Sequence, residues 1–413
     1  MHVCMINRVP WIRASVTSWL EHSEMEDTDV VLISRYDIPD SEKRGLSKFV
    51  YFESYDDDLA LEKLVIELHG ERPFDRIIAL SELDILRAAK LRSLLDIPGQ
   101  SYFSAFLYRD KIAMKEWASL AGISVPSFTV AFDQEDIYSF VARHGFPIII
   151  KPKNEYGSKN VSLISDKGEL QSFCRVLDFN DGLDVESFIQ GNLYHVDGII
   201  SNGRLVFTSV SMYLNSSGKS TTLFNEDIKP QFPLSTVADL QISPFSTPFK
   251  VLTNETRKLL ADPKFDNGSI HAEWILDESM KPYFIEIASR TGGLLISDAI
   301  QRKYGFIMNE ESFRVQLGLP FCASCVTDKL YGYLSILPKR GRIDKYDINT
   351  IANNSNVISF STSYKSGDYI DAQSESTDNI GLLLFEIDQR KTLLEQVEYW
   401  TLFLNSKIHV LSD

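Results

Sequence analysis

Long apolar runs are missing from this sequence of 413 residues. A helix that spans a membrane needs at least about 18 consecutive apolar residues, and no stretch of the chain supplies them. The first six residues pass directly into a short apolar segment with neither a basic start nor a cleavage signal, so we expect no targeting leader. These absences predict a soluble protein without a membrane partner.

Cysteine is also scarce. Four cysteines do not make a disulfide framework in a chain of this length, and we expect a reduced, cytoplasmic protein. Cys322 and Cys325 have the spacing of a redox motif or of half a zinc site. No second pair and no histidine follows nearby, so we favour two small, partly buried residues before a strand.

An excess of positive charge is the third absence. The chain has 42 Lys and Arg against 57 Asp and Glu, which gives a net charge of −15. A protein that binds nucleic acid needs a basic face to displace counterions from phosphates, so no nucleic-acid partner is expected. The hydrophobic content of 44% is ample for buried cores. At about 100–200 residues per domain, the length predicts two to four structural units.

The first third of the chain alternates two patterns. Short apolar runs typical of buried parallel strands occur at residues 3–6, 30–34, 49–52 and 74–80. Leucines at helical spacing lie between the last two of these runs, so we predict a parallel sheet covered by helices. Ligands of such sheets bind beyond the carboxyl ends of the strands, where Glu82 and Asp84 follow. The alternative, equally supported, is an ordinary acidic first turn of a helix.

The rest of the chain is richer in strands. We expect an N-terminal α/β domain at residues 1–108, a central domain at 109–317 with a flap at about 128–190, and a β-rich C-terminal region at 318–413. Within the central domain, Asn202-Gly203 between two apolar runs is a strong signal for a two-residue hairpin turn.

Lys151 ends a buried apolar run that begins at Pro147. Removing an ammonium group from water is costly unless it meets an anion. The following loop contains Gly157 and Ser158, and such a loop suits a flap over phosphates. For this segment alone, a lysine that extends to water beside a solvated turn is the favoured alternative.

Glu186 lies beside another apolar strand end. A connecting segment of this kind can bind adenine through its backbone, with the glutamate at the exocyclic amine. Taken alone, an edge strand with one outward polar residue is the simpler interpretation.

Glu273 and Glu286 fall on neighbouring strands of a predicted hairpin. Two facing carboxylates repel unless a hard cation lies between them, and Mg²⁺ prefers oxygen ligands. Arg290 follows and can hold a phosphoryl group or a carboxylate by a bidentate fork. Gly292 and Gly293 then permit close backbone approach. The alternatives are solvated or salt-bridged glutamates and a tight turn with a surface arginine.

Taken in order, these segments resemble the ATP-grasp superfamily of carboxylate–amine and carboxylate–thiol ligases, and within it the bacterial L-amino acid ligases. No single motif is diagnostic, but the ordered set covers nearly the whole chain. The segments that carry the resemblance are Arg109-Asp110-Lys111, Pro147 to Pro152, the glycine loop, Glu186, His195-Val196-Asp197-Gly198, the paired glutamates and Arg290. The resemblance implies a mixed α/β and α+β fold: a doubly wound N-terminal parallel sheet, a central ATP-binding subdomain and a β-rich C-terminal region.

The resemblance also implies roles for individual residues. ATP would be held at its phosphates by Lys111, Lys151 and the loop of Gly157 and Ser158, and at its adenine by Glu186 and Phe188 with His195 nearby. Glu273 and Glu286 would bind Mg²⁺, with two ions expected and Mn²⁺ as an alternative. Arg290 would stabilise an acyl phosphate. The amino-acid pocket would be shaped by Gly292 and Gly293 and reached by Glu82 and Asp84.

The implied activity is an ADP-forming ligation of two L-amino acids, with L-arginine as a candidate substrate. Homodimers are common among such enzymes. A carrier-protein thiol as acceptor and a non-catalytic ATP-binding module are the alternatives. The chain departs from the family pattern at Ala288, where many members have asparagine, and at Leu193, where an acid would hold the ribose. Its flap loop is also poorer in glycine.

Overall fold

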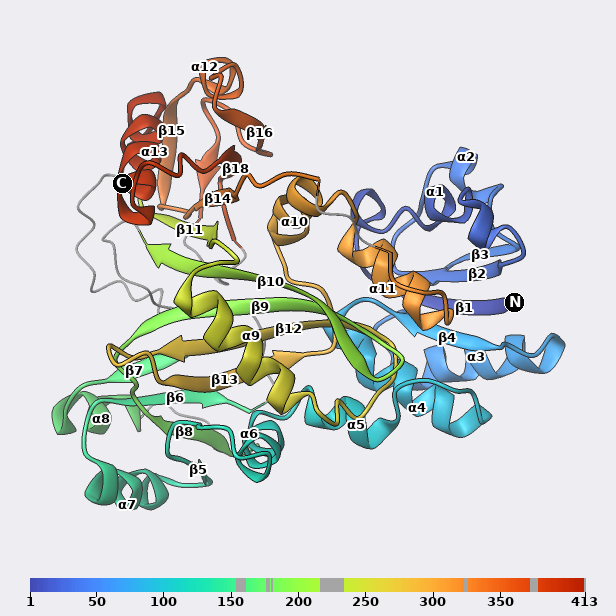
Figure 1. Cartoon of the computed structure of the whole chain (residues 1–413), viewed down its shortest axis with the longest axis horizontal. Helices are drawn as coiled ribbons and strands as arrows, with labels where there is room; N and C mark the ends of the chain where they lie inside the picture. The colour runs from blue at the N-terminus through green and yellow to red at the C-terminus, as the bar shows by residue number, and fades with distance from the viewer. Residues whose placement is uncertain are drawn as a thin grey trace.

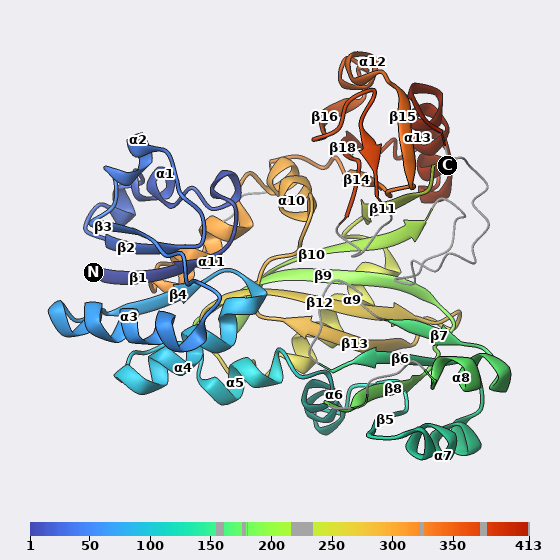
Figure 2. The same ribbon diagram turned by 180° about the vertical axis from the view of Figure 1, so that it is seen from behind.

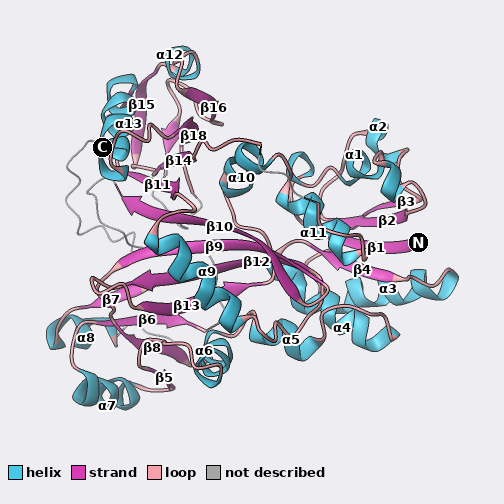
Figure 3. Cartoon of the chain, in the orientation of Figure 1, coloured by secondary structure: helices cyan, strands magenta, loops and turns pink. Residues whose placement is uncertain are grey.

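The computed structural model describes residues 1–153, 161–175, 179, 181–215, 234–322, 326–371 and 378–411. Within these ranges the strands form four sheets of four, eight, three and four strands. Figure 1 shows the N-terminal sheet at one end of the molecule and the large central sheet beside it. Figure 3 separates the helices from the strands by colour. None of the helices described in these ranges is long and apolar enough to cross a membrane.

The N-terminal sheet is parallel, as predicted. Its order is β3 (Lys48–Tyr51), β2 (Asp29–Ser34), β1 (His2–Asn7) and β4 (Arg76–Ala79). Every residue of β1 is buried, because helices cover both faces of the sheet. The helices on one face include α3 (Asp58–Glu71) and α4 (Ile85–Leu95), and those on the other include α1 (Val16–Leu20). Short turns of helix lie at α2 (Asp40–Lys43), η1 (Trp11–Arg13), η2 (Ser23–Met25) and η3 (Glu82–Asp84).

A helix from much later in the chain completes this N-terminal unit. Phe313 of α11 (Met308–Gln316) and the following Leu317 pack into the same core as Val3 and Met5 of β1. Figures 1 and 2 show α11 lying against the N-terminal sheet from opposite viewpoints. Chain order therefore does not follow spatial order here.

A second four-stranded sheet holds the predicted flap region. Its order is β5 (Phe128–Ala131), β8 (Leu183–Ser187), β6 (Ile148–Pro152) and β7 (Ser162–Ile164). Apolar residues of α7 (Gln134–His144) and α8 (Lys167–Phe173) pack against it. The helices α5 (Tyr102–Leu107) and α6 (Lys111–Leu120) precede it. Asp110 caps α6, because its carboxylate accepts hydrogen bonds from the backbone N–H groups of Ile112 and Ala113.

The central sheet has eight strands. In spatial order they are β13 (Pro282–Ala288), β12 (Gly268–Leu276), β9 (Asn192–Ser201), β10 (Arg204–Asn215), β11 (Thr236–Gln241), β14 (Tyr331–Ile336), β18 (Gly381–Glu386) and β16 (Val357–Ser361). The predicted turn joins β9 to β10, with φ of 50° at Asn202 and 69° at Gly203. Positive φ at both positions is what a tight hairpin requires.

Helices cover the two faces of this sheet. Together with α6, α9 (Thr247–Leu259) packs on a face that carries Trp274, while α10 (Ile296–Tyr304) packs on the opposite face. The C-terminal region is β-rich, as predicted, but three of its strands extend the central sheet. The rest forms β17 (Tyr369–Ile370), β15 (Gly341–Tyr346) and β19 (Ile408–Leu411), with α12 (Ile348–Ala352) and α13 (Leu393–Lys407). The domain boundaries given above stay predictions.

Candidate active site

The two glutamates expected to bind a metal lie opposite each other. Glu273 of β12 pairs with Glu286 of β13 in the antiparallel register, so their side chains point to the same face of the sheet. The Glu273 side chain is 14% exposed and that of Glu286 is 32% exposed, so neither is fully buried. This oxygen donor set fits a hard divalent cation such as Mg²⁺.

Lys111 stands beside this pair. As the first residue of α6, it places its Nζ 3.4 Å from Oε2 of Glu286. Its backbone N–H also donates to the carbonyl of Lys153, which follows β6. The structure therefore brings together a lysine expected to contact phosphate and a glutamate expected to contact metal.

Lys151 belongs to a buried group of four charges. Its Nζ lies 3.0 Å from Glu186 Oε1 and 3.7 Å from Asp184 Oδ2. Lys115 of α6 contacts the same two carboxylates and is completely buried. Burial opposes ionisation of Glu186, but Lys115 and Lys151 outweigh it and lower the pKa of that carboxyl. Burial raises the pKa of Asp184.

Sequence reasoning missed Lys115. The available signal was its spacing of four residues from Lys111, which places both lysines on one face of α6. Its two carboxylate partners lie on a distant strand, and nothing in the local pattern indicates them. Glu186 is consequently engaged by two ammonium groups rather than open to solvent, and its contact with adenine stays a prediction.

Phe188 follows β8, and its backbone N–H donates to the carbonyl of Pro147. The structure therefore holds the predicted adenine segment against the start of β6. Gly157 and Ser158 of the predicted flap loop lie outside the described residues, as does Cys325 of the cysteine pair.

Arg290 is joined to the N-terminal unit through Glu82. Its Nη2 and Nε lie 2.8 and 2.9 Å from Glu82 Oε2. Arg109 contacts the other oxygen of the same carboxylate. Burial would raise the pKa of Glu82, but Arg290 and Arg109 lower it to about 2. Glu82 thus reaches the Arg290 loop, while its expected place at the amino-acid pocket stays a prediction.

Asp84 does not reach the site, and this prediction is corrected. Its side chain is completely buried. The carboxylate accepts hydrogen bonds from Arg8 at 3.1 Å, from the hydroxyl of Tyr55 at 2.9 Å and from Arg87 at 3.3 Å. Glu82 and Asp84 are the first and third residues of η3, which has about three residues per turn. Their side chains therefore point to different sides of this helix.

The glycine pair after Arg290 has two different surroundings. A Cβ on Gly292 would lie 2.8 Å from Oδ1 of Asp197 and 2.8 Å from Cδ1 of Ile296, so this position accepts only glycine without a shift. A Cβ on Gly293 would meet nothing within 4 Å of the described residues. Packing against Asp197 and Ile296 therefore requires glycine at position 292, whereas at position 293 there is open space for a side chain.

His195 differs most from its expected role. It was expected near the nucleotide, but its side chain is completely buried in β9. Nδ1 lies 2.6 Å from Asp197 Oδ2 and Nε2 lies 2.7 Å from Asp239 Oδ2. Since both ring nitrogens are bonded to carboxylates, no polar edge is left for a nucleotide, and the prediction is corrected.

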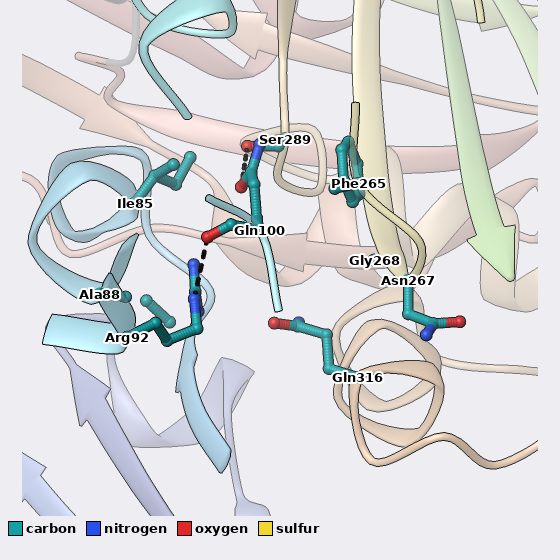
Figure 4. A pocket seen from close by; sticks show the side chains of 10 residues that line it. Ile85, Ala88, Arg92, Gln100, Phe265, Asn267, Gly268, Ser289 and Gln316 are labelled. Atoms are coloured by element: carbon teal, nitrogen blue, oxygen red, sulfur yellow. Dashed lines mark hydrogen bonds between the residues drawn. The ribbon is translucent and has the colours of Figure 1, made fainter. Parts of the chain in front are cut away.

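A separate small pocket lies where the N-terminal unit meets the central sheet. Arg92, Gln100, Ser289 and Gln316 are among its lining residues, and Figure 4 shows them converging from separate segments. Its volume of about 20 Å³ is room for roughly one water-sized group. It is therefore too small to be the site of a nucleotide or an amino acid.

No protein-family model matches the chain. The chain is similar in sequence to the L-arginine-specific L-amino acid ligase of Bacillus subtilis. The two are 26% identical over 355 residues, which cover 82% of this chain and 83% of that relative. The similarity thus extends over most of both proteins.

Solved structures agree on the fold. The L-amino acid ligase from Bacillus licheniformis superimposes with a TM-score of 0.74 at 18% identity, covering 100% of this chain and 98% of that one. The biotin carboxylase domain of a 2-oxoglutarate carboxylase from Hydrogenobacter thermophilus, solved with MgADP, gives 0.62 at 15% identity, covering 94% and 86%. The predicted ATP-grasp fold and the resemblance to L-amino acid ligases are confirmed.

Proposed function

We propose that this chain of ATP-grasp fold is an ATP-dependent, ADP-forming ligase that joins the carboxylate of one L-amino acid to the amine of another. The observation that carries the proposal is the pairing of Glu273 with Glu286 on one sheet face, beside Lys111 and four residues before Arg290. Similarity over most of its length to an L-amino acid ligase supports the same activity.

The reaction has two steps. The carboxylate of the first amino acid attacks the γ-phosphorus of ATP, and the bond from this phosphorus to the β–γ bridging oxygen breaks. The products of this step are ADP and an acyl phosphate. The neutral amine of the second amino acid then attacks the carbonyl carbon. Inorganic phosphate departs, and the amine loses a proton to solvent.

The charged residues of the site suit the negatively charged phosphates of this reaction. In this proposal Lys111 and Lys151 bind phosphate oxygens, and Arg290, whose Nε and Nη2 contact Glu82 in the structure, stabilises the acyl phosphate. Glu273 and Glu286 would hold Mg²⁺, which when bound offsets the negative charge of the phosphates. We propose two ions, with Mn²⁺ as a substitute.

L-Arginine is proposed as one substrate because the Bacillus subtilis relative is specific for it. Neither of the two acids expected to reach the amino-acid pocket is free to bind the guanidinium of this substrate. Asp84 is buried away from the site, and Glu82 already pairs with Arg109 and Arg290. The residue that would bind the guanidinium therefore stays open.

We further propose a cytoplasmic homodimer. The biotin carboxylase neighbour was solved as a dimer, which supports this assembly. Light scattering coupled to size exclusion tests it directly, since a mass close to 47 kDa would be that of a monomer.

The deciding experiment is a phosphate-release screen with ATP, Mg²⁺ and the twenty amino acids, singly and in pairs. We expect phosphate release only when an amino acid is present, together with formation of a dipeptide of the matching mass. Glu286→Gln should abolish both, whereas the exposed Glu21→Gln should change neither. Phosphate release without a dipeptide would favour a carrier thiol as acceptor, and no release with any pair would refute the ligase.

A further inference from the structure

Alternating acidic and imidazole side chains cross the central sheet on the face that carries Glu273. His195 of β9 is in register with Glu273 of β12, and Asp197 is in register with His271. Residues in register on neighbouring strands share a face, so the side chains of these two pairs lie together. Asp239 approaches His195 from β11, on the far side of β10. We call the four residues Asp239, His195, Asp197 and His271 the buried relay.

Small side chains on β10 make this crossing geometrically feasible. Ser209 is in register with Asp197, and Ser211 with His195. Both serines are buried. A larger residue at Ser211 would crowd the space beside His195, where the Tyr213 ring, in register with Asp239, already lies 4.8 Å from the His195 ring between centroids.

The contacts form a continuous path that ends at the proposed metal ligand. In order, Asp239 Oδ2 to His195 Nε2 is 2.7 Å, His195 Nδ1 to Asp197 Oδ2 is 2.6 Å, Asp197 Oδ1 to His271 Nδ1 is 3.0 Å, and His271 Nε2 to Glu273 Oε1 is 3.7 Å. The first three are hydrogen bonds, and the last is an ion-pair distance.

Burial makes the relay costly unless every group is paired. His195 is 0% exposed and Asp197 is 1% exposed. Both ring nitrogens of His195 meet carboxylate oxygens, which accept hydrogen bonds, so both are donors. Burial alone would lower the pKa of His195, but Asp239 and Asp197 raise it to about 10. Removing one partner would leave a buried charge uncompensated, which favours a single fixed arrangement.

The relay also supports the loop that carries Arg290. Oδ1 of Asp197 lies where a Cβ on Gly292 would be 2.8 Å away. Asp197 therefore contacts His271, which leads to the metal carboxylate, and lies close to Gly292, two residues after Arg290.

We propose that His195 and Asp239 are positioning residues, which hold Asp197 and His271 so that Glu273 is oriented for the divalent cation. This inference rests on the proposed function, because it takes Glu273 as a metal ligand. Partners that fix metal ligands typically change metal affinity by about 10–100-fold when they are removed.

The test uses Asp239→Asn, which preserves the shape of the side chain and contacts neither metal glutamate. The readout is binding of Mn²⁺ to the full-length protein in the presence of ADP, measured by the electron paramagnetic resonance signal of free Mn²⁺. We expect affinity to fall by about tenfold or more. ADP binding in the presence of EDTA should be unchanged. His195→Gln should act in the same direction.

His2→Gln is the matched control, because it removes another buried imidazole, which lies in β1 far from the relay. Its Mn²⁺ affinity should equal that of the wild type. Unchanged Mn²⁺ affinity in a folded Asp239→Asn protein would overturn the inference and leave the proposed function standing. Failure of the wild type to bind Mn²⁺ with ADP would overturn both. If His195→Gln does not fold, Asp239→Asn alone decides.

Discussion

At Glu82, one carboxylate joins two arginines from different parts of the chain. Its pKa falls from an ordinary 4.5 to about 2, so its contribution to stability is complete above pH 4.5 and is lost as the pH falls towards 2. Glu82→Gln should therefore reduce the free energy of unfolding by roughly 3 kcal/mol at pH 7 and by less than half of that at pH 3.

Urea unfolding at both pH values measures this difference. Glu21→Gln is the control, because Glu21 is exposed, and it should show no dependence on pH between the two. An equal loss of stability at pH 7 and pH 3 would show that the ion pairs of Glu82 are not its source.

Arg290 gives a second prediction at this scale. Arg290→Lys keeps the charge but loses the planar fork that binds two oxygens at once, so amino-acid-dependent ADP release should fall by about 100-fold or more. Arg109→Lys separates this effect from loss of the Glu82 contact, since Arg109 shares that carboxylate. A loss equally large in Arg109→Lys would place the effect in Glu82 rather than in the fork.

At the scale of elements, Lys115 connects α6 to the sheet of the predicted flap. It is completely buried against Asp184 and Glu186 of β8. Lys115→Met leaves these carboxylates short of one cation, and we expect unfolding to become easier by about 3–5 kcal/mol. Lys63→Met, at a side chain that is 79% exposed, should stay within about 0.5 kcal/mol. Equal thermal midpoints for the two variants would contradict this account.

Local pattern predicted some of these elements well. The parallel strands of the first third follow from their apolar runs, and the turn at Asn202 and Gly203 follows from the conformations those residues favour. The facing of Glu273 and Glu286 also follows, because a hairpin makes pairing local.

Contacts between distant segments could not be predicted in this way. The bond from His195 to Asp239 crosses an intervening strand, and the partners of Lys115 lie about 70 residues away. Asp84 was misplaced because two neighbouring acids look alike in sequence, whereas the turn of η3 separates them. Periodicity identifies an element and its buried face, but not which distant side chain meets it.

For the whole molecule, α11 makes the N-terminal unit dependent on the rest of the chain. Phe313 and Leu317 together bury apolar surface worth about 3–6 kcal/mol against the N-terminal sheet. Domains typically have only about 5–15 kcal/mol of net stability. We therefore expect a fragment of residues 1–108 to bind the dye ANS and to unfold without a sharp transition.

The matched control adds residues 306–319 to this fragment through a flexible Gly/Ser linker. Cooperative unfolding should return, and dye binding should fall. A fragment of residues 1–108 that unfolds as sharply as the extended version would refute the dependence on α11.

The late position of α11 has a consequence for synthesis on the ribosome. Translation reaches this helix roughly 230 residues after β4, which at about 5–20 residues per second takes on the order of 10–50 s. During that interval the sheet face that carries Val3 and Met5 is covered by α1 but not by α11, while the nascent chain lengthens. The nascent chain thus exposes apolar surface to chaperones until α11 has been synthesised.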